Sequence, residues 1–296
     1  MEKLVAQLRQ NLDVVWQPNK ATRTRFLSDD PMDGRPSCSQ EDFEQPRLRK
    51  CVFDLAAIDL KRSSRMGGGL DGYLWKVWFG EQAFVLKVFW DAVPPQFPHY
   101  FAAQREGQNA ALLQMMEAAV EDAASGSEFP ILVNPRPETK SEAMGNTRAF
   151  SDQGRRGQLP SQGSGAATMA ISSIPRIKKC YGWTRIHGST ISVAWPKKLH
   201  PGTLRVDRKV TREFSASEEY IAILYEYVDE RDNEHAAVER AADFYWHAGF
   251  GYTMSSAARN WKDGVLVDLS DIVHVSGYGW NQGGYGPRSA AMILLD

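Results

Sequence analysis

The feature that most constrains the fold is a glycine-rich segment that stands directly before two aromatic, β-branched runs. The segment covers residues 67–72, and Gly67, Gly69 and Gly72 have the spacing of a phosphate-binding loop. A dinucleotide-binding loop leads into a helix, whereas residues 73–79 and 83–90 predict a β-hairpin. We therefore expect a turn between strands, where backbone N–H groups can approach phosphates because no Cβ intervenes. A flexible turn that binds nothing is the alternative.

A lysine and a glutamate follow the glycines at a spacing that indicates an ion pair. Lys87 lies between Leu86 and Val88 in the second run, and Glu106 comes 19 positions later in a helix predicted over residues 100–123. A lysine on the inward face of a sheet needs a counter-charge or an anionic ligand. We expect a strand-to-helix pair of the kind that places a lysine against the α- and β-phosphates of ATP. The alternative is two unrelated surface charges.

Composition and charge narrow the classes of protein. The 296 residues include 43% hydrophobic and 24% charged side chains, enough to bury the core of one two-lobed domain or of two small ones. The formal net charge of -1 provides no general attraction for nucleic acid or for an anionic membrane, so neither is an expected partner. Three separated cysteines, no N-terminal signal segment and no apolar run of membrane-spanning length predict an intracellular protein of the cytoplasm or nucleus.

Two regions are predicted to lie outside the packed core. Residues 2–16 have apolar side chains at helical spacing and predict an amphipathic helix. The polar, proline-containing segment that follows it, up to residue 50, is predicted to be a flexible arm. Residues 134–173 are rich in Ser, Gly, Gln, Pro and Arg and have almost no large apolar side chains. Such a segment cannot offset its ordering entropy by burial, so we predict a disordered insert.

The remaining elements follow one another in a recognisable order. After the hairpin and the helix come strands predicted over residues 175–186 and 219–228, a helix over 234–248 and a short strand over 265–267. Residues 53–133 and 174–275 together resemble a eukaryotic protein kinase domain. The resemblance implies an α+β, protein-kinase-like, two-lobed fold over residues 51–296. Its N-lobe, 51–228, would contain a twisted antiparallel sheet and one long helix, and 229–296 would form a truncated helical C-lobe.

The same resemblance implies roles in a nucleotide site. Tyr225 would be the gatekeeper, and the backbones of Glu226 and Val228 would face the adenine of ATP. The phosphates would be held by the glycine turn and the ion pair, that is by Gly67, Gly69, Gly72, Lys87 and Glu106. Asn260 and Asp268 carry oxygen atoms of the type that binds Mg²⁺. ATP with Mg²⁺ is therefore the cofactor that the resemblance implies.

Two departures from the kinase pattern argue against phosphoryl transfer. The segment Thr253-Met254-Ser255 stands where kinases have His-Arg-Asp, and the Ser255 hydroxyl is far too weak a base to accept a substrate proton. Only 28 residues follow Asp268, fewer than an activation segment and a peptide-binding helical half require, and no Ala-Pro-Glu is present. We therefore expect a catalytically impaired pseudokinase that acts by binding a protein partner.

A closer likeness is to the fungal group of degenerate kinase-like proteins that includes the Fta-type inner-kinetochore subunit. It rests on Gly72-Tyr-Leu-Trp-Lys-Val77, Lys179-Cys-Tyr-Gly-Trp183 and residues 259–271, among other segments. Two alternatives to a nucleotide-binding pseudokinase stay open. One is a scaffold subunit without nucleotide, as a kinetochore role would permit. The other is an active atypical kinase that phosphorylates a small molecule with another base.

Overall fold

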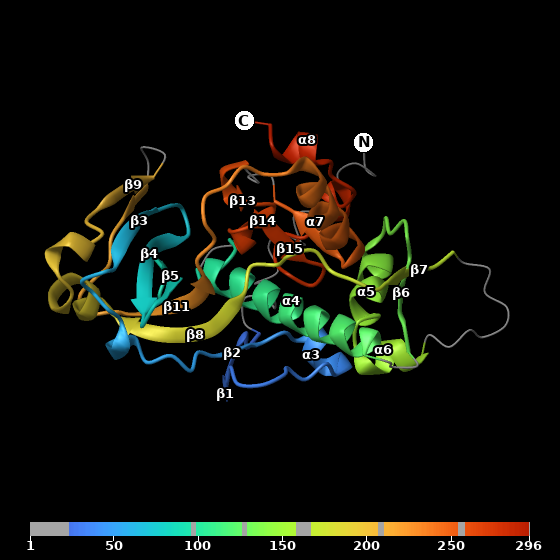
Figure 1. The fold of residues 1–296 in the computed structure, drawn as a ribbon, viewed down its shortest axis with the longest axis horizontal. Helices are drawn as coiled ribbons and strands as arrows, with labels where there is room; N and C mark the ends of the chain where they lie inside the picture. The colour runs from blue at the N-terminus through green and yellow to red at the C-terminus, as the bar shows by residue number, and fades with distance from the viewer. Residues whose placement is uncertain are drawn as a thin grey trace, which may run out of the picture.

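The seven-stranded sheet, most of which lies at the left of the molecule in Figure 1, joins strands that lie far apart in the sequence. The computed structural model describes residues 24–95, 99–125, 129–157, 167–206, 210–253 and 258–295. Seven strands run in the order β1 (Leu27–Pro31), β2 (Leu48–Lys50), β8 (Cys180–His187), β11 (Glu219–Glu226), β5 (Gln82–Phe89), β4 (Gly72–Phe79) and β3 (Ser64–Gly68). With the helices described below, this sheet confirms the predicted α+β class.

The five strands from β8 to β3 are antiparallel, but the two at the other end are not. β1 pairs in parallel with β2, and β2 pairs in parallel with β8. Both come from the segment predicted as a flexible arm, so that prediction is wrong for residues 24–50. Apolar packing explains the difference, because Leu48 is fully buried and Phe43 in α3 (Gln40–Glu44) is also buried. The Trp183 indole also donates a hydrogen bond to Ser28 O at 2.7 Å.

The long helix α4 (Ala102–Ala124) lies against the inner face of the sheet and confirms the helix predicted over residues 100–123. It is buried around most of its circumference, because the segment that contains Leu269 and Ile272 covers it as well. Asn109 Nδ2 donates to the carbonyl oxygens of both these residues, at 2.9 and 2.7 Å. In the described part of the chain, neither α4 nor any other helix is long and apolar enough to cross a membrane.

Residues 188–218, which connect β8 to β11, cover the outer face of the sheet. They contain two helical turns, η2 (Thr190–Ala194) and η3 (Lys197–Leu199), and a hairpin of β9 (Leu204–Val206) and β10 (Val210–Arg212). Trp75 of β4 is fully buried under this layer, and its indole donates to Leu199 O at 2.8 Å. Because both faces of the sheet are covered, β5 is buried on both sides along most of its length.

The chain beyond β11 forms a second part of the molecule, in which α7 (His235–His247) confirms the helix predicted over 234–248. The other elements here are the pairs β12 (Phe250–Tyr252) with β15 (Ile272–His274) and β13 (Trp261–Lys262) with β14 (Val265–Leu266), and the short helix α8 (Ala290–Ile293). β13 and β14 are joined by Asp263 and Gly264, both with positive φ, which is typical of a two-residue hairpin turn. This part therefore contains paired strands as well as the helices that we predicted.

The prediction of a disordered insert over residues 134–173 is wrong for most of that range. It contains α5 (Lys140–Arg148) and α6 (Asp152–Gly157), and β7 (Met169–Ile171) pairs with β6 (Ile131–Val133). Local interactions outweigh the polar composition: Thr139 and Glu142 form a capping box, and the buried Arg155 donates to Ala119 O at 3.0 Å. Residues 158–166, the helix predicted over 2–16 and Ser255 lie outside the described residues.

Candidate functional site

Lys87 lies in the middle of the sheet and faces α4. In the register of the sheet it stands opposite Leu74 of β4 and Ile223 of β11. Lys87 is only 4% exposed, and its ammonium forms an ion pair with the carboxylate of Glu106 in α4. Glu106 is only 1% exposed. The strand-to-helix ion pair predicted from the sequence is therefore confirmed.

Asp268 reaches the same lysine from a third element. Lys87 Nζ lies 3.0 Å from Asp268 Oδ1, which also accepts hydrogen bonds from the backbone and the hydroxyl of Ser270. Burial alone would raise the pKa of Asp268, but Lys87 and Ser270 outweigh burial and hold this pKa far below its ordinary value. Burial alone would lower the pKa of Lys87, but Asp268 and Glu106 raise it instead. Lys87 is therefore charged and Asp268 ionised at neutral pH.

Glu106 is the member of this cluster that titrates near neutral pH. Burial raises its pKa to about 7, although Lys87 opposes the shift. Its second oxygen accepts a hydrogen bond at 3.1 Å from the hydroxyl of Tyr225, the predicted gatekeeper. Tyr225 is fully buried, so its hydroxyl acts within the cluster and not on solvent.

A second buried lysine, which we did not single out from the sequence, adjoins the cluster. Lys178 is 4% exposed, its ammonium lies 3.8 Å from the centroid of the Tyr225 ring, and it donates to Val267 O at 2.6 Å. Burial lowers the pKa of Lys178 to about 8, although Glu106 opposes the shift. Two adjacent lysines before a strand usually indicate solvent exposure, so no sequence signal distinguishes Lys178 from the exposed Lys179.

The glycine-rich segment forms the connection between β3 and β4, as predicted. Gly67 has a φ of 127°, and a Cβ on Gly72 would lie 2.4 Å from Val88 O of the neighbouring strand. Both positions therefore require glycine for reasons of strand geometry. The Gly69 N–H donates to Gly72 O at 2.9 Å, and Gly69 O accepts a hydrogen bond from the Trp90 indole at 2.9 Å. The turn is thus held closed by its own backbone and by Trp90.

Asp71, near the tip of this turn, is a further residue that the sequence pattern did not reveal. Its carboxylate accepts a hydrogen bond from the hydroxyl of Tyr100, which immediately precedes α4. It also lies close enough to Lys87 to contribute to the raised pKa of that lysine. Asp71 therefore connects the glycine turn with both α4 and the buried ion pairs.

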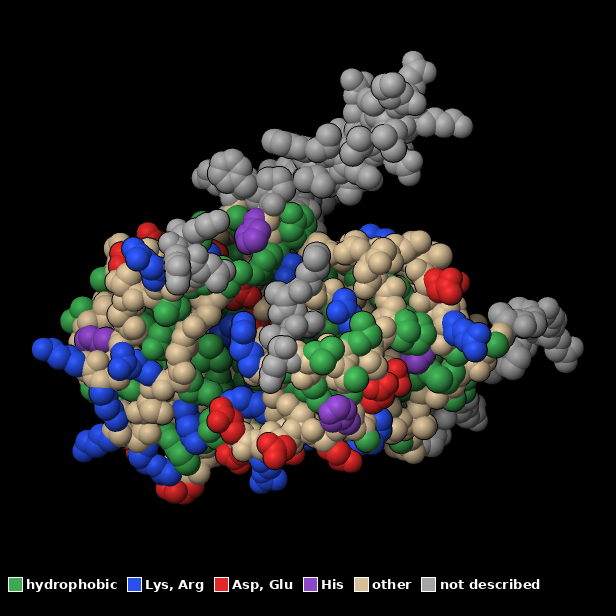
Figure 2. Space-filling model, turned by 90° about the horizontal axis from the view of Figure 1, so that it is seen from above, with side chains coloured by type: hydrophobic (Ala, Val, Ile, Leu, Met, Phe, Trp, Pro, Cys, Tyr) green, Lys and Arg blue, Asp and Glu red, His purple; other side chains and the backbone are tan. Residues whose placement is uncertain are grey.

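Glu226 and Val228 lie where the chain leaves β11. Figure 2 shows a hollow on the upper face of the molecule. The Glu226 N–H donates to Lys179 O at 2.9 Å, and its carboxylate accepts from the Lys179 N–H at 2.7 Å. Val228 is buried. Between them, the Tyr227 ring contacts the ammonium of Lys76, which lies 3.6 Å from the ring centroid. This contact connects Lys76 of β4 to the segment that follows β11.

The structure gives Asn260 and Asp268, the predicted Mg²⁺ ligands, different partners. Asn260 precedes β13, and its side-chain N–H₂ donates to Asp271 Oδ2 at 2.9 Å, whereas Asp268 bonds to Lys87. The backbone carbonyl oxygen of Asn260 accepts a hydrogen bond from the backbone N–H of Val267 at 2.8 Å, and this bond closes the hairpin formed by β13 and β14. Within the described ranges, no three His, Cys, Asp or Glu side chains are grouped so as to hold a metal ion.

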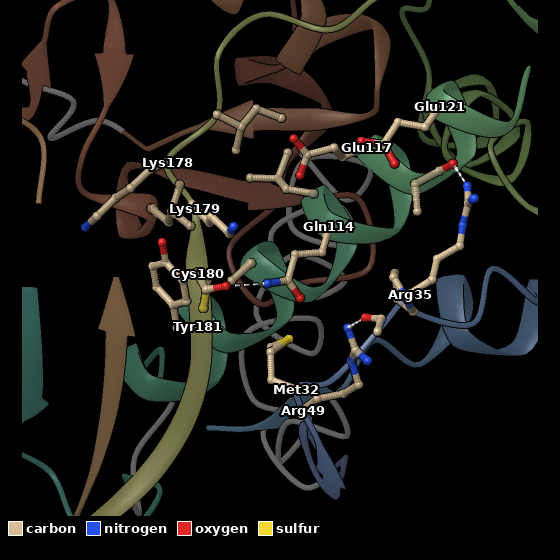
Figure 3. Close-up of a pocket in the computed structure, with 17 residues that line it drawn as sticks. Met32, Arg35, Arg49, Gln114, Glu117, Glu121, Lys178, Lys179, Cys180 and Tyr181 are labelled. Atoms are coloured by element: carbon tan, nitrogen blue, oxygen red, sulfur yellow. Dashed lines mark hydrogen bonds between the residues drawn. The ribbon is translucent and has the colours of Figure 1, made fainter. Parts of the chain in front are cut away.

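A cavity of about 610 Å³ opens on another side of α4, between this helix, β8 and the arm before β2 (Figure 3). Its lining includes Lys178 but not Lys87, Glu106 or the glycine turn. Some of its polar side chains bond to the protein: Gln114 donates to Cys180 O at 2.8 Å, and Arg49 donates to Gly34 O at 3.1 Å. The sequence could not reveal this cavity, because it exists only where the arm folds against α4.

Comparisons with known proteins assign no family to this arrangement. No protein-family model, no curated protein and no solved structure matches the chain.

Proposed function

We propose that the chain has a protein-kinase-like, two-lobed fold and acts as a pseudokinase that binds a protein partner. The observation that carries the proposal is the meeting of Lys87, Glu106 and Asp268 from three separate elements. In protein kinases a lysine on the third strand pairs with a glutamate on the next helix, and an aspartate from a later Asp-Phe-Gly motif completes the site. β5 is the third of the five antiparallel strands in chain order, and residues 268–270 have the place of that motif.

The residues of this site do not fit a Mg-nucleotide. Asp71 brings a carboxylate to the glycine turn, close enough to Lys87 to raise the pKa of this lysine, and like charges in a partly buried site repel one another strongly. The Gly69 N–H, which would face a phosphate, is already bonded to Gly72 O. The Asn260 side-chain N–H₂ donates to Asp271, so this side chain is oriented by Asp271 and not by Asp268, the other Mg²⁺ ligand that the kinase resemblance implies. We therefore favour a pseudokinase without nucleotide over the nucleotide-binding form.

Phosphoryl transfer is also not part of the proposed function. The sequence has Ser255 where a kinase has its catalytic aspartate, and a serine hydroxyl cannot accept the substrate proton at neutral pH. Without chemistry to perform, the cluster around Lys87 would act as a structural lock between the sheet, α4 and the Asp268 segment. A set of buried charges is stable only when complete, because loss of one member leaves the others uncompensated. Such a lock would present a constant surface to the partner.

Thermal unfolding with nucleotides and a transfer assay test this function. A protein that bound ATP would gain about 2.7 kcal/mol at a concentration one hundred times the dissociation constant. We expect the melting temperature of the wild-type protein to be unchanged by ATP or ADP, with or without Mg²⁺. We also expect no transfer of labelled γ-phosphate to casein or to small alcohols.

Two results would contradict this function in different ways. A higher melting temperature with ATP that Lys87→Met abolishes would favour the nucleotide-binding pseudokinase. Phosphate transfer by the wild-type protein that Lys87→Met abolishes would establish an enzyme and overturn the pseudokinase proposal. Lys50→Met, at an exposed lysine on β2, is the matched control for both measurements.

A further inference from the structure

The end of the molecule that contains β3, η3 and β9 is strongly cationic. Residues 185–212 include seven Lys or Arg side chains and one acidic side chain, although the whole chain has a net charge of -1. Figure 2 shows Lys and Arg side chains gathered at the left end of the molecule, where Figure 1 places these elements. Five exposed residues define what we call the cationic end: Lys61, Arg65, Lys197, Lys198 and Arg205. The net charge of the chain conceals this asymmetry.

Hydrogen bonds hold these side chains near one another without neutralising them. Lys198 donates to the carbonyl oxygens of Lys61 and Ser63, and Arg65 donates to His200 O at 2.8 Å. A carbonyl oxygen satisfies a donor but does not offset its charge. Three neighbouring arginines differ, because each has a carboxylate within about 3 Å: Arg62 with Glu81, Arg185 with Glu219 and Arg212 with Asp91. The cationic end thus keeps an uncompensated positive charge among the described residues.

Apolar side chains and an open strand edge accompany this charge. Met66, next to Arg65 on β3, is 41% exposed, and Val210, in the hairpin that carries Arg205, is 39% exposed. Among the strands that the structure describes, β3 is the last of the sheet, so one of its edges has no neighbouring strand there. An open edge can accept an extended segment through backbone hydrogen bonds. A nucleic acid would use the cations but neither the apolar side chains nor the strand edge, so a polypeptide fits better.

We propose that the cationic end binds an extended, acidic segment of a partner protein that also carries large apolar side chains. This inference rests on the proposed role in partner binding and specifies the chemistry of the partner. Carboxylates of the segment pair with the five cations, and its apolar side chains cover Met66 and Val210. Its backbone adds to the open edge of β3. Charge complementarity also accelerates the encounter between the two proteins.

Selection from a random-peptide phage library on the full-length protein tests the inference. We expect the selected peptides to be enriched in Asp and Glu alternating with Leu, Ile or Val. The double variant Lys197→Glu, Arg205→Glu should bind the best peptide at least about tenfold more weakly, because two attractive charges become repulsive. These two residues suit the test because neither side chain has a hydrogen bond within the described ranges. The control double variant Arg136→Glu, Arg240→Glu, at exposed positions elsewhere, should bind normally.

Three results would overturn the inference. The first is a set of selected peptides without acidic enrichment. The second is equal binding of the best peptide by the two double variants. The third is a labelled DNA duplex that binds more tightly than that peptide at the same ionic strength. The last result would assign the surface to nucleic acid instead. None of them depends on nucleotide or phosphate transfer, so this inference and the proposed pseudokinase function fail separately.

Discussion

Asp71 accepts a hydrogen bond from the hydroxyl of Tyr100, and this single contact joins the glycine turn to the start of α4. Burial and the charge of Asp71 both raise the pKa of Tyr100, so the hydroxyl remains protonated and donates throughout the physiological range. Because Asp71 also acts on Lys87, the contact connects the surface turn with the buried ion pairs. The turn is therefore closed by the side chains of the protein, with no ligand required.

Tyr100→Phe should open the glycine turn. The change removes a hydrogen bond to a charged acceptor, and we expect a loss of about 1 kcal/mol in the free energy of unfolding because both groups are partly exposed. Amide hydrogen exchange at Gly69 should become faster, since its N–H bonds only to the turn. Tyr181→Phe is the control, because no hydrogen bond of its hydroxyl is present in the described residues. Unchanged exchange at Gly69 in Tyr100→Phe would show that the contact does not hold the turn.

Lys87→Met should destabilise the protein strongly. The substitution leaves the carboxylates of Glu106 and Asp268 close together without a cation, and breaking a buried ion pair in this way typically costs about 3–5 kcal/mol. Urea unfolding followed by tryptophan fluorescence measures the loss. The double variant Lys87→Met, Glu106→Gln should recover part of it, because one of the two uncompensated charges is then absent. A loss no larger than that of the exposed control Lys50→Met would rule out the structural lock.

Sequence reasoning reached the parts of the site that depend on local pattern. Lys87 and Glu106 belong to long, regular elements whose order determines which faces meet, so their ion pair was predictable. The roles of Asp71 and Lys178 depend on contacts with Tyr100 and Val267, which are distant in the chain and follow no periodicity. The arm before β2 was mispredicted because polar composition was given more weight than Leu48 and Phe43, two scattered apolar residues that find buried positions.

The lowered pKa of Lys178 predicts a pH dependence of stability. Its pKa is about 8 in the folded protein and 10.5 is the ordinary value, so between these limits the unfolded chain binds more protons. Stability should therefore rise with pH from about 8 to about 10 relative to the variant Lys178→Met, by on the order of 1 kcal/mol per pH unit. Lys178 also lowers the pKa of Glu106, which is about 7, so the two proteins differ in the titration of Glu106 at lower pH and the test of Lys178 itself lies above pH 8.

Unfolding in urea at a series of pH values gives this difference directly. Lys179→Met is the matched control, because Lys179 adjoins Lys178 in the chain but is exposed. Its stability should keep a constant difference from the wild type over the same pH range. Parallel pH profiles of stability for the wild type and Lys178→Met would mean that the pKa of Lys178 is not lowered in the folded protein.

Thr139→Ala should loosen the folded region that the sequence composition had indicated as disordered. Thr139 and Glu142 satisfy each other's backbone N–H groups at the start of α5, and loss of an N-cap side chain typically costs about 1 kcal/mol. We expect trypsin to cleave after Arg148, in the last turn of α5, more rapidly in the variant than in the wild type, as measured by mass spectrometry over time. The rates of trypsin cleavage at other sites should not change in Thr139→Ala. The control variant Thr211→Ala, at an exposed threonine, should be cleaved after Arg148 at the wild-type rate. Rapid cleavage after Arg148 in the wild type, equal to that in Thr139→Ala, would support the disordered insert and contradict a stable α5.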